Sequence, residues 1–97
     1  MKGGLLIVFL LSAIITDPAK IGQINRAKEE AKKAYLAGDY EKGVDNMCRA
    51  YVMYQDTNSP KKIEAQKNLA FYLDDLKEKG KFEIFKKAAT NNGIILE

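Results

Sequence analysis

The 97-residue chain contains no histidine, no tryptophan and only one cysteine, and these absences exclude several kinds of active site. Without histidine there is neither a Ser-His-Asp nor a Cys-His catalytic group. One cysteine cannot form an intramolecular disulfide, and there is no Cys/His cluster for zinc. Cys48, beside Met47, is expected to be buried as a packing residue. The sequence therefore predicts no metal and no other cofactor.

The excess of positive over negative charge is also small. Sixteen Lys and Arg residues against 13 Asp and Glu give a net charge of +3, with no run of five like charges. The segment 60–79 carries Lys61, Lys62 and Lys67, but four acidic residues in the same segment dilute this positive charge, so nucleic acid is not the expected partner. The acidic pair at 74–75 would point in different directions on a helix and would not share a proton. We predict that the protein is not an enzyme.

The first sixteen residues differ from the rest of the chain. Residues 3–16 carry no charge, and Leu5–Leu11 is an unbroken apolar run. As a helix, residues 3–16 would be about 21 Å long, shorter than the hydrocarbon core of about 30 Å. Lys2 is typical of a signal peptide, but small residues are poorly placed for cleavage. We expect residues 1–16 to form a hydrophobic helix, either a signal anchor or a signal peptide, that attaches the protein to a membrane through residues 3–16. The alternative is a buried helix or strand of a soluble domain.

The remainder, residues 17–97, shows the signals of a helical domain. Asp17-Pro18 and Ser59-Pro60 each combine a capping side chain with a proline at the first helical position. Apolar residues recur at steps of three and four, and Gly38 and Gly80 are typical of helix ends. These signals predict helices at 17–38, 39–56, 60–79 and 81–91, packed as antiparallel hairpins in one all-α domain without a sheet.

Two further expectations concern packing within this domain. The apolar cluster from Leu69 to Leu73 should lie at the centre of the core. The apolar tail 94–96 should either dock back on the helices or fray at the end of the chain.

The stretch from Ala31 to Val44 resembles the tetratricopeptide repeat (TPR) family. The matching residues are Ala31 on the first helix, Gly38-Asp39-Tyr40 at the turn, and Gly43 and Ala50 on the second helix. The resemblance implies a TPR-like hairpin in which small residues allow close approach of the helices and Tyr40 packs between them. The next such turn comes 42 residues later, at Gly80, instead of about 34, so only residues 25–56 are interpreted as a repeat.

The resemblance also implies a binding groove, because the first helix of a TPR lines the concave face. It places Asn25, Lys28, Lys32, Tyr35 and Leu36 in this groove. Two lysines beside a tyrosine suggest a site for an acidic or carboxylate-ended peptide. The alternative is that the lysines are a solvated face and that Tyr35 belongs to the core.

Together these features predict a membrane-anchored, TPR-like adaptor or scaffold subunit that binds a protein or peptide without catalysis. Gly38–Asp45, following an N-terminal anchor, is also similar to the small presequence receptors of the mitochondrial outer-membrane translocase, which bind basic targeting helices. Lys28, Lys32 and Lys33 stand where that family has apolar and acidic residues. The alternatives are therefore a mitochondrial preprotein import receptor and a structural single-span subunit of a membrane complex.

Overall fold

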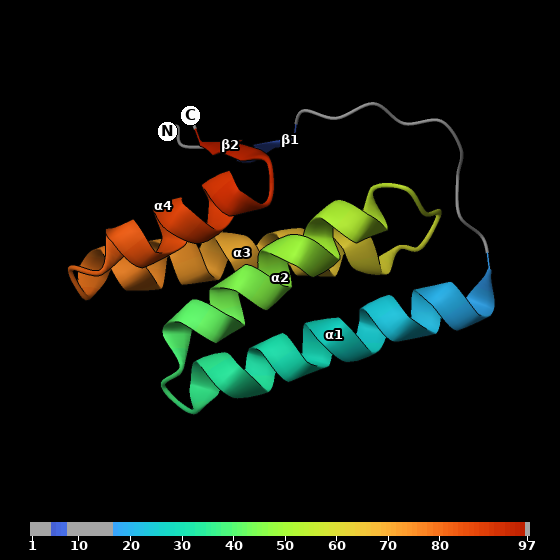
Figure 1. Ribbon diagram of the computed structural model, residues 1–97, viewed down its shortest axis with the longest axis horizontal. Coiled ribbons are helices and arrows are strands. Elements are labelled where there is room, and N and C mark those ends of the chain that lie inside the picture. Colours follow the sequence, from blue (N-terminus) through green and yellow to red (C-terminus); the bar gives the residue numbers. More distant parts are fainter. Residues whose placement is uncertain (1–4, 8–16, 97) are drawn as a thin grey trace.

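The computed structural model of the chain describes residues 5–7 and 17–96. These residues form four helices and two short strands (Figure 1). In chain order the elements are β1 (Leu5–Ile7), α1 (Pro18–Leu36), α2 (Tyr40–Tyr54), α3 (Lys61–Glu78), α4 (Phe82–Asn91) and β2 (Ile94–Leu96). The prediction of an all-α fold is confirmed for the body of the molecule, and each helix lies inside its predicted range.

Side-chain oxygens at or just before the start of α1, α2 and α3 accept hydrogen bonds from free backbone N–H groups. The side-chain oxygens of Asp17, Asp39 and Ser59 accept hydrogen bonds from backbone N–H groups two or three residues further on, at 3.0, 3.3 and 3.2 Å. Such bonds stabilise the first turn, where the backbone has no partner of its own. Asp17 caps α1 as predicted, with Pro18 at its first position, whereas α3 begins one residue later than its signal indicates, at Lys61, with Pro60 at the N-cap position.

Two helices end at glycines with positive φ. Gly38 has a φ of 92° and Gly80 a φ of 70°, a region that other residues seldom adopt. The N–H of the residue after each glycine donates to a carbonyl in the last turn of the helix, at Ala34 and Leu76 respectively. This geometry reverses the chain and lets the next helix fold back.

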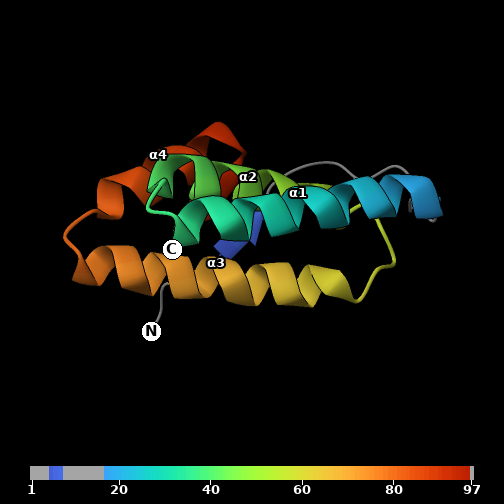
Figure 2. The same ribbon diagram turned by 90° about the horizontal axis from the view of Figure 1, so that it is seen from below.

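The four helices form two antiparallel hairpins. The pair α1 and α2 makes the first, the pair α3 and α4 makes the second, and α2 also contacts both helices of the second hairpin (Figure 1). Figure 2 shows α1 and α3 side by side and running in the same direction. Side-chain contacts agree, because Lys28 bonds to Glu64 and Tyr35, further along α1, bonds to Asp75, further along α3.

The core lies between the two hairpins and draws on every helix. Its largest fully buried apolar side chains are Ile24, Met47, Tyr54, Leu69, Leu76 and Phe85. The predicted close approach of α1 and α2 is also present. A Cβ atom on Gly43 would lie 2.8 Å from the Cβ and backbone nitrogen of Tyr35, and Ala31 and Ala50 are fully buried.

Phe71 does not follow the prediction for the cluster 69–73. Leu69 and Leu73 are buried as expected, but Phe71 is 63% exposed, and Ile63 on the same helix is 57% exposed. Two residues along a helix turn the side chain by about 200°, so Phe71 points away from the core that Leu69 enters.

The expected hydrophobic N-terminal helix is not seen in the described residues. Three of its residues, Leu5–Ile7, form strand β1 instead, paired antiparallel with β2 so that Leu6 lies opposite Ile95. Residues 8–16 of the predicted helix lie outside the described residues. The prediction that the chain has no sheet was wrong, because strands of three residues are too short to show an alternating pattern. Among the described residues, no helix combines the length and the apolar character needed to cross a membrane.

Candidate functional site

The five predicted groove residues do not line one open groove. Asn25 accepts a hydrogen bond at its side-chain oxygen from the hydroxyl of Tyr54, on α2. Lys28 and Tyr35 point to α3 and bond to it. Lys32 is partly exposed, and Leu36, at the end of α1, is 85% exposed. Asn25, Lys28 and Tyr35 thus bond to other helices, and Lys32 also lies near carboxylates of the chain, so of the five only Leu36 is fully open.

Lys28 is a buried partner in an ion pair. Its side chain is only 1% exposed, and Nζ donates to Oε1 of Glu64 at 2.5 Å and lies 3.4 Å from Oε2 of Glu29. The nearby Lys32 shares the same two carboxylates, at 3.7 Å from Glu29 and 3.9 Å from Glu64. The hydrogen bond from Lys28 lowers the pKa of Glu64. The predicted positive groove is therefore neutralised by acidic residues of α1 and α3.

Tyr35 joins α1 to α3 through its ring and its hydroxyl. The ring stacks on Tyr72, with centroids 3.9 Å apart and planes 11° apart, and the hydroxyl donates to Oδ2 of Asp75 at 2.5 Å. Burial, followed by the contact with Asp75, raises the pKa of Tyr35. Hydrogen bonds from Lys79 and then from Tyr35 lower the pKa of Asp75. Tyr35 thus packs α1 on α3, which agrees with the alternative that Tyr35 belongs to the core and not to an open groove.

An exposed apolar surface adjoins this contact. The ring of Phe71 lies edge-on to the ring of Tyr72, with the two ring centroids 6.1 Å apart, and Tyr72 in turn stacks on Tyr35. We use the name α1–α3 face for the solvent side of these two helices, represented by Lys32, Leu36 and Phe71. Sequence reasoning missed Phe71 because it treated the apolar cluster as one unit. The angle of about 200° between Leu69 and Phe71 around the helix is the signal that would have placed Phe71 on the solvent side.

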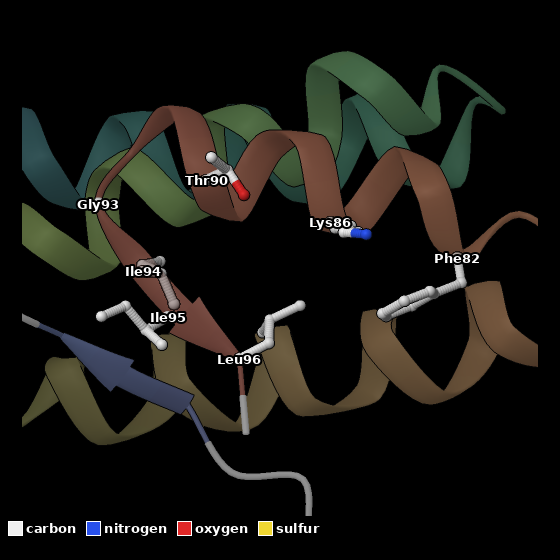
Figure 3. Close-up of a pocket in the computed structure, with 7 residues that line it drawn as sticks. All are labelled: Phe82, Lys86, Thr90, Gly93, Ile94, Ile95 and Leu96. Carbon is white, nitrogen blue, oxygen red and sulfur yellow. The ribbon is translucent and has the colours of Figure 1, made fainter.

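A second feature is a pocket of about 670 Å³ between α4 and β2, far in sequence from the predicted groove. Its lining consists of Phe82, Lys86, Thr90, Gly93, Ile94, Ile95 and Leu96 (Figure 3). Phe82 extends from α4 toward Leu96 on the strand, while Lys86 and Thr90 supply polar atoms. Nothing in the local sequence predicted this pocket, because it exists only when the tail folds back along α4.

The one thiol has the properties of a packing residue. Cys48 is fully buried in α2, and burial raises its pKa to about 12. A thiol of this kind stays protonated at neutral pH and is a poor nucleophile. Within residues 5–7 and 17–96, no three Cys, Asp or Glu side chains are grouped so as to hold a metal ion.

Comparison of the chain with protein-family models, with curated proteins and with solved structures finds no match. The contacts and exposed surfaces of the described residues are therefore the basis for a proposed function.

Proposed function

We propose that the protein is a non-catalytic, TPR-like adaptor that residues 3–16 anchor to a membrane and that binds a protein or peptide partner on the α1–α3 face. The observation that carries the proposal is the parallel alignment of α1 and α3, which lie side by side (Figure 2) and are joined by side-chain bonds. Helical-repeat proteins stack hairpins in this way and use the aligned helices as a binding surface.

The chemistry of this face favours an apolar contact over an acidic ligand. Phe71 and Leu36 are large apolar side chains at 63% and 85% exposure, and exposed aromatic residues are common anchors of protein interfaces. Lys28 is buried, and Lys32 already shares Glu29 and Glu64. The proposed partner therefore places an apolar side chain against Phe71, and its polar groups meet a surface of mixed charge.

Site-specific photo-cross-linking in membranes of the source cell tests this proposal. A photoreactive phenylalanine analogue at Phe71 should give a discrete adduct with one polypeptide, because the partner covers this ring. The same analogue at Met53, which is exposed on α2 at 42%, provides the matched control and should give no such adduct. Equal adducts at both positions, or none at Phe71, would contradict the proposal.

The anchor requires a separate measurement. The full chain should stay with the membrane pellet after extraction at high salt and at alkaline pH, whereas a chain lacking residues 1–16 should be released. Release of the full chain would show that the adaptor is not held by its N-terminal segment, even if the Phe71 adduct forms.

A further inference from the structure

The C-terminal strand β2 is held in place by the helical body. Gly93, with a φ of 75°, reverses the chain after α4. The side-chain amide of Asn92 donates to Oδ1 of Asp45, on α2, at 2.9 Å and to the carbonyl of Ala88 at 2.8 Å. Ile94 is 3% exposed and belongs to the core. These contacts fix the start of β2 through residues that belong to α2, α4 and the core.

The exposure of β2 alternates along the strand. Ile94 is buried, Ile95 is 47% exposed and Leu96 is half-buried, so Ile94 enters the core while Ile95 is the most open of the three, and all three line the pocket beside α4. One edge of β2 pairs with β1, in a register that places Leu5, Leu6 and Ile7 opposite Leu96, Ile95 and Ile94. The tail thus offers a fixed strand edge to an apolar segment, and the strand paired with it comes from the N-terminal apolar run.

The same three residues are also part of the proposed membrane anchor. In a bilayer no water is present to bond exposed backbone groups, so a single inserted segment satisfies them internally as a helix. In strand β1 the backbone is instead extended and bonds to β2. One segment cannot have both conformations at once. A two-stranded pairing of only three residues per strand is also only marginally stable, so Leu5–Ile7 can leave it at low cost.

We propose that β2 is a docking site for the N-terminal segment of the same chain, so that Leu5–Ile7 has two mutually exclusive positions: paired with β2 when no bilayer is available, and inserted when one is. This inference rests on the proposed membrane anchor and adds a regulatory step to it. Insertion withdraws β1 and frees the edge of β2 with which it pairs (Figure 3).

Disulfide cross-linking of the full chain tests the proposal. In a Cys48→Ala background, Leu6→Cys and Ile95→Cys place two thiols at directly opposite positions of the ribbon, within the range that a disulfide spans. In buffer this pair should oxidise rapidly within one molecule. Vesicles of phosphatidylcholine and phosphatidylglycerol should slow the oxidation about tenfold or more, because insertion depletes the paired state.

A matched control carries Leu6→Cys with Leu36→Cys, since Leu36 is exposed at the end of α1 and away from β2. This control should oxidise slowly with and without vesicles, and circular dichroism should show that both variants keep their helices. Oxidation of the 6/95 pair at the rate of the control, or only into dimers, would overturn docking within one chain.

Flotation of the vesicles separates this inference from the anchor itself. If the chain floats with the vesicles but the 6/95 pair oxidises at an unchanged rate, the anchor is supported, but the proposal that insertion and pairing with β2 exclude each other is wrong. If the chain does not float, the anchor fails and the membrane position proposed for Leu5–Ile7 fails with it.

Discussion

Lys28 shows how the environment of a single residue changes the meaning of a sequence pattern. Lys28 and Lys32 are one helical turn apart, and the spacing predicts that both face a ligand. In the structure only Lys32 reaches solvent, because Glu64 comes from α3 to pair with Lys28. The partner is 36 residues away in sequence, so helical periodicity within α1 gives no sign of it.

Substitutions at Lys28 should show the difference between losing its positive charge and burying a negative charge in its place. Lys28→Glu should lower the free energy of unfolding by about 3–5 kcal/mol, because it buries a carboxylate beside Glu64 and Glu29. Lys28→Met, similar in size and apolar, leaves Glu64 and Glu29 without this partner, but both carboxylates are about half exposed to water, so it should cost less than Lys28→Glu. Urea denaturation followed by circular dichroism measures both values.

The control for these variants is Lys33→Glu, at an exposed position on the same helix. It should cost less than about 1 kcal/mol, mainly through the helix dipole. Equal destabilisation by Lys28→Glu and Lys33→Glu would show that Lys28 is not buried as described.

The carboxylates that face α1 also predict an acid sensitivity. The pKa of Glu64 is lowered from its ordinary 4.5, first by the hydrogen bond from Lys28, and the pKa of Asp75 is lowered from 3.8 by Lys79 and then Tyr35. A folded-state pKa below the unfolded one contributes stability above the unfolded value, and this contribution is lost as the pH falls through the folded value. Stability should therefore decline below about pH 4.5.

Thermal unfolding between neutral pH and pH 3 measures this decline. Glu64→Gln should make the curve shallower, since one of the groups that take up protons on unfolding is removed. If the variant and the parent lose stability in parallel, the ion pair with Lys28 does not contribute to the acid response.

At the scale of elements, the contact between α1 and α2 depends on the absence of a side chain. A Cβ atom at Gly43 would lie 2.8 Å from both the Cβ and the backbone nitrogen of Tyr35, and backbone cannot move aside easily. Gly43→Ala should therefore destabilise the protein by about 1–3 kcal/mol, although alanine favours a helix. The midpoint of thermal unfolding gives the direction and the size of the effect.

Gly22 provides the matched comparison because it also lies inside a helix. A Cβ atom there would meet only the end of the Arg26 side chain, at 3.9 Å. Gly22→Ala should raise stability by about 1 kcal/mol through helix propensity alone. A stabilising Gly43→Ala would refute the close approach of the two helices.

The elements differ in how well their sequence predicts them. Helix boundaries follow from local signals, since capping side chains such as Asp17 and turn glycines such as Gly38 act on adjacent backbone. The ribbon of β1 and β2 was missed because its two strands lie at opposite ends of the chain and each contributes only three residues. Their pairing depends on where the helices leave the tail, which no short window of sequence contains.

At the scale of the whole molecule, the second hairpin changes the predicted site. Because only residues 25–56 were interpreted as a repeat, the surface of α1 was expected to be open, and the groove prediction followed from that view. In the structure α3 lies along α1 and supplies Glu64, Tyr72 and Asp75 to it. The sequence thus predicted the helices and the contact at Gly43, but the groove depended on how the two hairpins associate, and this was not predictable from either hairpin alone.

The arrangement of Tyr35 gives the molecule an optical property. A phenol ring that stacks on another ring and donates its hydroxyl to a carboxylate loses much of its fluorescence, and Tyr35 has both contacts with α3. Because the chain has five tyrosines and no tryptophan, its ultraviolet emission comes from tyrosine alone. Separation of the two hairpins should therefore increase the tyrosine emission, so that their association can be followed in the native chain without an added dye.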